Sequence, residues 1–239
     1  AARVCGEALA SRREGHALIF MPGAYEIRKT IEALGRDKWA KAFEIVPLHG
    51  ELPPSQQDAA VRAGGPRRII VSTNVAETSL TIPRIACVID TGVARVSRWS
   101  PGKGVQRLLV EPVSRASARQ RKGRCGRVRD GVCVRLYEEL ELEERPEFTD
   151  PEIRRSSLAG VILRMKSLGL PEIDEFPFLD APSPKAVAEG YRTLREVGAL
   201  DREKKLTAYG REMARMPVDP KLARMIIEAR KEHCLAEIL

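Results

Sequence analysis

In the segment Ile69-Ile70-Val71-Ser72-Thr73-Asn74, three β-branched apolar residues are followed at once by small hydroxyl and amide side chains. A short β-branched run predicts a buried strand, and the polar residues after it predict a loop. Similar apolar runs alternate with amphipathic segments over residues 1–140, which is the pattern of βαβ units and a parallel sheet. We therefore predict a doubly wound α/β domain over these residues.

Strands and helices in this domain are assigned from the same alternation. Strands are expected at residues 17–21, 45–48, 69–72, 87–90, 106–110 and 132–137. Helices are expected at residues 24–34, 55–63 and about 116–125.

The pattern changes after an acidic segment at residues 138–152. Apolar residues then recur at helical spacing, at Leu158, Val161, Ile162, Met165 and Leu168. A second helix is expected at residues 184–197 and a short polar hairpin with a basic tip at 200–206. Two helices and a small wing predict an all-α winged-helix module.

A further amphipathic helix is expected from Asp219 onward. The chain would then comprise the α/β domain at residues 1–140, the winged helix at 141–216 and the start of another helical domain at 217–239. We expect this last part to be a truncated piece of that domain.

Composition narrows the classes of function. The net charge is +8, and residues 115–129 hold seven basic residues and no acidic one, so a polyanionic partner is expected at this segment. No apolar run approaches the roughly 20 residues that span a bilayer, so no membrane association is expected. The five cysteines include no C-x-x-C pair, which argues against a zinc site or disulfide framework and favours the cytoplasm.

The most specific pattern is Gln120-Arg121-Lys122-Gly123-Arg124-Cys125-Gly126-Arg127. On a helix, Gln120, Arg124 and Arg127 are spaced i, i+4 and i+7 and share one face. Two guanidinium groups and an amide suit the γ-phosphate of a nucleotide, because planar donors match the negative charge of the transition state. Arg121 would point to a different side and is expected to matter less for hydrolysis. Two glycines in such a helix each cost about 1 kcal/mol, which disfavours an incidental basic helix.

This pattern resembles the Q-R-x-G-R-x-G-R motif that closes the ATP site in the DEAH-box helicases of superfamily 2. Residues 72–82, Ser-Thr-Asn-Val-Ala-Glu-Thr-Ser-Leu-Thr-Ile, resemble motif V of that family. Residues 18–23 resemble its motif IV, residues 88–95 its hook-turn segment, and the insertion from Trp99 to Val110 its β-hairpin. Residues 145–153 look most like bacterial HrpA-type members. The resemblance runs from about Gly15 to the end of the chain.

The resemblance implies roles for individual residues. Those expected to act at the γ-phosphate, two of them as arginine fingers, are Gln120, Arg124 and Arg127. Those expected to bind the nucleotide are Ser79, Thr81 and Gly123. Those expected to bind RNA are Gly23, Arg28, Thr73, Asn74 and Arg95. No metal ligand is expected in this chain.

The family further implies a second RecA-like domain that couples ATP hydrolysis to 3′-to-5′ translocation on RNA and to unwinding. Its partners would be RNA and the first RecA-like domain of the same polypeptide, which would hold most of the Mg²⁺ that accompanies ATP. The 239 residues contain neither a G-x-x-x-x-G-K-[ST] loop nor a D-E-A-H run. We therefore expect this segment to be inactive as an ATPase alone.

Two other functions remain open from the residues themselves. A non-enzymatic nucleic-acid-binding module would use the basic helix and the winged helix for affinity, and Gln120 would then have no role. A DNA-directed superfamily 2 helicase is the other alternative, because backbone contacts dominate the binding of both nucleic acids.

Overall fold

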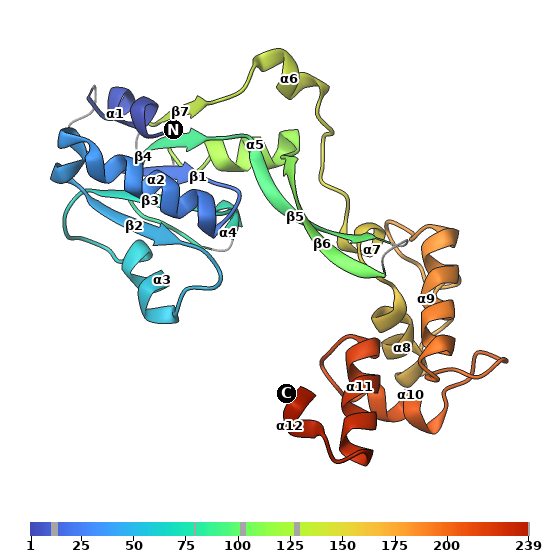
Figure 1. Ribbon diagram of the computed structural model, residues 1–239. Helices are drawn as coiled ribbons and strands as arrows, with labels where there is room; N and C mark the ends of the chain where they lie inside the picture. The colour runs from blue at the N-terminus through green and yellow to red at the C-terminus, as the bar shows by residue number, and fades with distance from the viewer. Residues whose placement is uncertain (11–13, 79, 101–103, 127–129, 239) are drawn as a thin grey trace. The chain divides into compact units, whose positions relative to one another are not determined.

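The computed structural model describes residues 1–10, 14–78, 80–100, 104–126 and 130–238. The chain divides into two compact units, whose elements are labelled in Figure 1. Unit 1 comprises Ala1–Val96 and Leu108–Thr149, and unit 2 comprises Ser97–Arg107 and Asp150–Leu239.

Unit 1 is built on a five-stranded parallel sheet with the strand order β2-β3-β1-β4-β7. Its strands are β1 (His16–Phe20), β2 (Glu44–Leu48), β3 (Arg68–Ser72), β4 (Ile85–Asp90) and β7 (Val132–Arg135). The non-sequential order places β1 between β3 and β4 at the centre of the sheet. This arrangement confirms the parallel α/β sheet that the apolar runs predicted.

Both faces of the sheet are covered. Ala17 and Ile19 of β1 belong to the core on one face, with residues of α1 (Ala2–Ala10) and α2 (Ala24–Arg36). Leu18 and Phe20 belong to the core on the other face, with residues of α3 (Pro54–Val61) and α4 (Val75–Thr78). Because neighbouring side chains of a strand point to opposite faces, a strand covered on both sides is apolar throughout.

Three elements within residues 1–149 differ from the expectations. Helix α1 was not predicted, although Cys5 and Leu9 lie one helical turn apart and are buried. The hairpin formed by β5 (Val93–Ser100) and β6 (Val105–Pro112) begins at Val93 rather than at Trp99. Helix α5 (Arg115–Lys122) ends earlier than expected. The remaining elements are η1 (Lys38–Ala42) and α6 (Glu139–Glu144).

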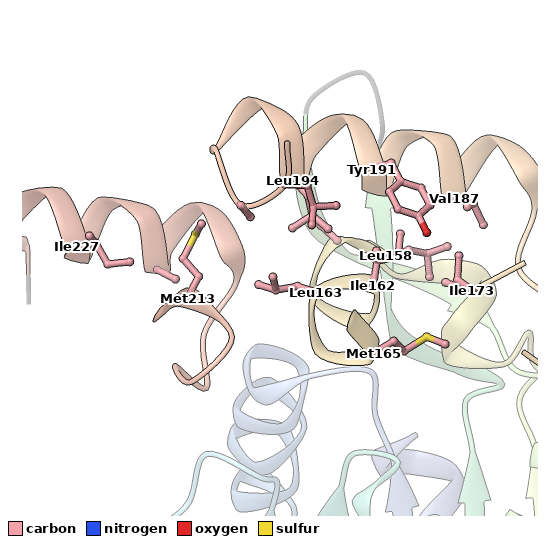
Figure 2. Packing of buried hydrophobic residues seen from close by; sticks show 14 residues of the cluster. Leu158, Ile162, Leu163, Met165, Ile173, Val187, Tyr191, Leu194, Met213 and Ile227 are labelled. Atoms are coloured by element: carbon pink, nitrogen blue, oxygen red, sulfur yellow. The ribbon is translucent and has the colours of Figure 1, made fainter. Parts of the chain in front are cut away.

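Unit 2 is helical apart from its share of the hairpin. Its helices are α7 (Glu152–Arg155), α8 (Ala159–Ser167), α9 (Pro184–Glu196), α10 (Ala208–Met213), α11 (Pro220–Lys231) and α12 (Leu235–Ile238). Figure 2 shows their common core, in which Tyr191 and Leu194 of α9 pack with Leu158 and Ile162 at α8. Within the described residues, no helix is both long and apolar enough to cross a membrane.

The packing of α8 against α9 depends on a glycine. A Cβ at Gly190 would lie 3.2 Å from the carbonyl carbon of Leu158 and 3.3 Å from the nitrogen of Ala159, so a side chain would force the helices apart. After α9, Leu200 and Leu206 form an antiparallel bridge that closes a short wing. The second helix and the wing lie where the sequence predicted them, and the winged-helix prediction is confirmed.

A buried arginine and a buried histidine lie together where β1 and β3 begin. The Arg68 side chain is 2% exposed, and its Nε donates to Glu44 Oε2 at 2.9 Å. Its Nη1 and Nη2 donate to the carbonyls of Arg62 at 2.7 Å and Gly64 at 3.1 Å. The backbone N–H of Arg68 donates to Nδ1 of His16 at 3.0 Å. This interaction requires His16 to keep Nδ1 unprotonated.

His16 therefore predicts a loss of stability in mild acid. The pKa of His16 is lowered from 6.5 to about 4, mainly by burial. The positive charges of Arg68, Arg84 and Arg67 add to this lowering, and the negative charge of Glu44 opposes it. The unfolded chain consequently binds a proton more readily than the folded chain between these two values. The contribution of His16 to the free energy of unfolding is therefore complete above about pH 6.5 and is lost as the pH falls towards about 4. We expect about 2 kcal/mol of this loss by about pH 5, measured by urea unfolding.

The control for this prediction is His16→Asn. The Asn Oδ1 atom offers an acceptor to the Arg68 N–H but does not titrate, so the variant should show a flatter pH dependence in this window. If wild type and His16→Asn lose stability in parallel between about pH 6.5 and 5, His16 is not the cause.

Candidate nucleotide and nucleic-acid site

Several predicted site residues follow neighbouring strands at the carboxyl edge of the sheet. The N–H of Met21, after β1, donates to the carbonyl of Ser72 in β3 at 2.7 Å. The Thr91 hydroxyl, after β4, donates to the carbonyl of Phe20 in β1 at 2.8 Å. These bonds hold the segments after β1, β3 and β4 together. In open parallel sheets this is the edge at which ligands bind.

Two of the predicted RNA-binding residues are brought into contact there. The Arg95 guanidinium lies directly over Gly23, where an added Cβ would lie 2.7 Å from Arg95 Cζ. Any side chain at position 23 would therefore displace the guanidinium. Nη2 of Arg95 also lies 3.5 Å from Oε1 of Glu26, a residue in the first turn of α2. The pairing leaves the Arg95 side chain 40% exposed, so it remains accessible to a phosphate.

The other predicted RNA-binding residues lie on the same segments. Arg28 in α2 is exposed, with its guanidinium 5.9 Å from the centre of the Tyr25 ring. Asn74 is exposed and Thr73 is half-buried, directly after β3. Small polar side chains, a guanidinium and an aromatic ring are groups that contact nucleic-acid backbones and bases.

The shared helical face predicted for Gln120, Arg124 and Arg127 does not form as expected. Helix α5 begins after the N-cap Ser114, whose hydroxyl accepts from the N–H of Ser117, and it ends at Lys122. Gly123 is its C-cap and Gly126 has a φ of 92°, so the chain leaves the helix before position 127. Gln120 and Gly123 are exposed at the end of α5. Arg127 lies outside the described residues.

Arg124 lies just beyond the helix and contacts the segment that follows β3. Its guanidinium donates through Nη1 to the Leu80 carbonyl at 2.9 Å and through Nη2 to the Glu77 carbonyl. The residue is 8% exposed. Of the predicted nucleotide-binding residues in this segment, Thr81 is exposed and Ser79 lies outside the described residues. The structure thus joins the two motifs through Arg124.

Arg121, which helical spacing did not single out, forms hydrogen bonds with a residue that follows β3 and with a residue at the end of β4. Its side chain is fully buried. Nε donates to Glu77 Oε2 at 3.0 Å, and Nη1 donates to Asp90 Oδ1 at 2.8 Å and to the Val93 carbonyl at 3.2 Å. The guanidinium carbon lies 4.7 Å from the centre of the Phe20 ring. A buried cation with two carboxylate partners is a structural feature that spacing along a helix cannot reveal.

Asp90 anchors this group to the end of β4. It is fully buried and also accepts from the Tyr137 hydroxyl and from the Gly92 N–H, at 2.8 and 2.9 Å. Burial, followed by the charge of Asp90, raises the pKa of Tyr137, so its hydroxyl stays protonated and donates. The Asp90 carboxylate therefore accepts hydrogen bonds from three donors, which are the Arg121 guanidinium, the Tyr137 hydroxyl and the Gly92 N–H.

The positive charge of residues 115–129 is partly neutralised. Arg115 Nη2 lies 2.7 Å from Glu147 Oε2, and Arg119 pairs with the other oxygen of the same carboxylate. The hydrogen bond from Arg119 is the main reason that the pKa of Glu147 is lowered. With Arg121 and Arg124 buried, counting basic residues overestimated the charge that this segment presents to a polyanion.

Burial affects the acidity of two cysteine thiols in this unit. Burial raises the pKa of Cys133 and of Cys5 to about 12, so both thiols remain protonated at neutral pH. Within the part of the chain that the structure describes, there is no group of three or more His, Cys, Asp or Glu residues that could hold a metal ion.

Two family models match the chain. The helicase conserved C-terminal domain matches residues 1–129, and the winged-helix helicase-associated domain (HA2) matches residues 191–218. The first match covers strands β1 to β4 of the parallel sheet and the arginine-rich segment at residues 115–129. The second covers the last part of α9, the wing and α10.

Relatives and solved structures agree with these matches. The chain is 49% identical over 236 residues to the ATP-dependent RNA helicase HrpA of Escherichia coli (strain K12) and 49% identical over 238 residues to the HrpA homolog of Haemophilus influenzae. Each alignment covers 97% of this chain but only 18% of the relative. Two crystal structures of the Escherichia coli helicase HrpB, also described as a DExH-box NTPase, are 32% identical, with TM-scores of 0.88 and 0.84. They match 99% of this chain and 30% and 29% of their own chains. The chain therefore belongs to the DEAH-box helicases, among their HrpA-like members, and contains the helicase C-terminal domain and its winged helix.

Proposed function

We propose that this chain is the second motor domain of an ATP-dependent RNA helicase that translocates 3′ to 5′ and unwinds RNA. The observation that carries the proposal is the contact between the two motifs at the carboxyl edge of the sheet. Arg124 binds the carbonyls of Glu77 and Leu80, so the arginine-rich segment lies beside the polar segment that follows β3. The relatives named as RNA helicases support the choice of RNA as the substrate.

In this proposal the arginine-rich segment completes an ATP site whose other wall is the first RecA-like domain. Arg124 and Arg127 act as arginine fingers that stabilise the charge developing on the γ-phosphate, and the Gln120 amide orients the attacking water. Ser79, Thr81 and Gly123 contact the nucleotide. Each Nη nitrogen of Arg124 carries two N–H groups, so the guanidinium can donate to phosphate oxygens while it keeps the Glu77 and Leu80 carbonyls as partners.

Mg²⁺ belongs to the other wall of this site. This chain has no D-E-A-H run, the motif that holds the ion in the family that it resembles. Bound there, Mg²⁺ would neutralise charge on the β- and γ-phosphates.

RNA is held along the segments after β1, β3 and β4. Arg95 over Gly23, exposed Arg28, and Thr73 with Asn74 contact the RNA backbone. Opening and closing of the ATP site then moves these contacts relative to those of the first RecA-like domain.

We retain the three-part division of the chain at residues 1–140, 141–216 and 217–239. The HA2 match ends at residue 218 and α11 begins at Pro220, which supports the second boundary. We also retain the cytoplasm as the compartment, because the five cysteines lie far apart and include no C-x-x-C pair.

A binding module without catalysis is the competing function. It would use the arginines of residues 115–129 as exposed phosphate ligands. Their burial and pairing argue against that use, since Arg121 is fully buried and Arg124 is 8% exposed. Cations that serve only for affinity remain at the surface, where they can release counterions from phosphates.

The first test is ATP hydrolysis by this chain and by the intact protein. The chain alone should turn over ATP at the background rate, because it contains neither the phosphate-binding loop nor the D-E-A-H residues. The intact protein should show hydrolysis that RNA stimulates, measured as phosphate release under steady-state conditions. RNA-stimulated turnover by the isolated chain, or none by the intact protein, would overturn the proposed division of the ATP site.

A further inference from the structure

We propose that Arg121 is a positioning residue for ATP hydrolysis: its buried guanidinium holds the Glu77 segment against the end of α5, and so fixes where Arg124 lies. The inference rests on the proposed function, because it concerns the rate of the reaction that Arg124 serves. It differs from the expectation that Arg121 matters less for hydrolysis because it points to a different side of the helix.

Glu77 is bound from three sides by residues of the arginine-rich segment. Its Oε2 accepts from Arg121 Nε at 3.0 Å, its Oε1 accepts from the Ser117 hydroxyl, and its backbone carbonyl accepts from Arg124 Nη2. Glu77 lies in α4, a helix of only four residues. So short a helix has little stability of its own, and its position depends on such contacts. The location of the Glu77 carbonyl, and with it the Arg124 guanidinium, therefore follows from the Arg121 contact.

The same guanidinium group is also bonded to the sheet. Nη1 donates both to Asp90 Oδ1 and to the Val93 carbonyl. Asp90 is the last residue of β4, and Val93 is the first residue of β5. Asp90 is fully buried and is held by the Tyr137 hydroxyl as well. Arg121 thus links a rigid point of the sheet to a short, weakly held helix.

A lysine cannot replace this link. The two bonded nitrogens of Arg121 point to Glu77 and to Asp90 at fixed angles, whereas an ammonium is a single point charge on a flexible chain. Arg121→Lys would keep the buried charge but release one of the two carboxylates. A displacement of catalytic groups by about 1 Å costs roughly 10²-fold in rate, so the effect should appear in kcat.

A matched control exists in the same unit. Arg68 is also buried, donates to one carboxylate, Glu44, at 2.9 Å and bonds two backbone carbonyls, but it lies where β3 begins. Arg68→Lys should therefore cost a similar amount of stability without moving the segments after the strands. The comparison separates a positioning role from a purely structural one.

The test uses the intact helicase and measures kcat and KM for RNA-stimulated ATP hydrolysis, together with the thermal unfolding midpoint. We expect Arg121→Lys to lower kcat at least about tenfold with KM within about threefold, and Arg68→Lys to leave kcat within about twofold at the same loss of midpoint. Glu77→Gln, which leaves one oxygen acceptor in place of two, should lower kcat like Arg121→Lys. The double variant should be no slower than the slower single variant, because both act through one contact.

Equal kcat values for Arg121→Lys and Arg68→Lys would overturn the inference. If Arg121→Lys does not fold, Glu77→Gln decides the question alone: an unchanged kcat overturns the inference and a lowered one supports it. Arg124→Ala in the same assay distinguishes this failure from failure of the proposed function. If Arg124→Ala hydrolyses ATP at the normal rate, the arginine-finger role itself is refuted. If Arg124→Ala loses hydrolysis while Arg121→Lys keeps the normal rate, only the positioning role is refuted.

Discussion

Replacing Arg127 by alanine in the intact helicase is expected to lower the rate of ATP hydrolysis by at least about two orders of magnitude. The residue is the last arginine of the Q-R-x-G-R-x-G-R pattern, and in the proposed function its guanidinium contacts charge that develops at the γ-phosphate. Arginine fingers in phosphoryl transfer contribute roughly 10³ to 10⁵ in rate. The loss should appear in steady-state phosphate release at saturating ATP and RNA.

The affinity for RNA should change far less in the same variant. At most one phosphate contact is at stake, so the dissociation constant should change by less than about tenfold in a fluorescence-anisotropy titration. Arg127→Lys should recover little activity, because an ammonium does not reproduce the planar fork of donors. The two measurements together separate a catalytic arginine from one that binds nucleic acid.

Arg119→Ala is the matched control for this experiment. Arg119 belongs to the same basic segment, but its side chain is 57% exposed and pairs with Glu147 at the surface. Its removal should leave hydrolysis close to that of the wild type. Near-normal turnover with lost RNA binding in Arg127→Ala would instead support the binding module.

The sheet could be predicted from sequence because its signal is local. Runs such as Ile69-Ile70-Val71 and Val88-Ile89 are apolar at every position, since helices cover both faces of the sheet. Strand β5 was harder to recognise. Most of its residues are only partly buried, and charged and polar side chains are mixed there with apolar ones, as an exposed hairpin allows.

The candidate site was predicted less completely, and α5 shows why. Helical spacing was extended from Gln120 to Arg127, across two glycines that permit the chain to leave the helix. The structure ends α5 at Lys122, and Gly126 takes a positive φ that other residues rarely adopt. Periodicity predicts which side chains share a face only while the helix continues.

The burial of Arg121 could not be predicted from its neighbours. It lies in the most basic part of the chain, where an arginine is normally solvated. Its partners are 44 residues away at Glu77 and 31 residues away at Asp90, so the fold alone brings them together. Substitutions at these contacts should therefore change the free energy of unfolding as well as the rate of ATP hydrolysis.

Replacing Asp90 by alanine is expected to destabilise unit 1 by about 3–5 kcal/mol. The substitution removes the acceptor of Arg121 Nη1 and of the Tyr137 hydroxyl, both at 2.8 Å. Arg121 is fully buried, and it would keep only Glu77 as a carboxylate partner. Breaking a buried ion pair by removing one partner has a cost of this size, because a charge is left without compensation in a medium that solvates it poorly. Urea unfolding of the chain, followed by circular dichroism, measures the change.

Two further variants show whether the charge or the volume of Asp90 is responsible. Asp90→Asn keeps the side-chain size and one oxygen acceptor, so it should lose less stability than alanine while still leaving Arg121 with one carboxylate. Lys29→Ala breaks an ion pair of similar geometry with Glu32, 3.0 Å apart but exposed to solvent, and should leave the unfolding midpoint nearly unchanged. If Asp90→Ala costs no more than Lys29→Ala, the contacts of Arg121 with the sheet contribute little. Arg121 could then not hold the Glu77 segment in place, because its link to β4 would be too weak to resist the movement of that segment.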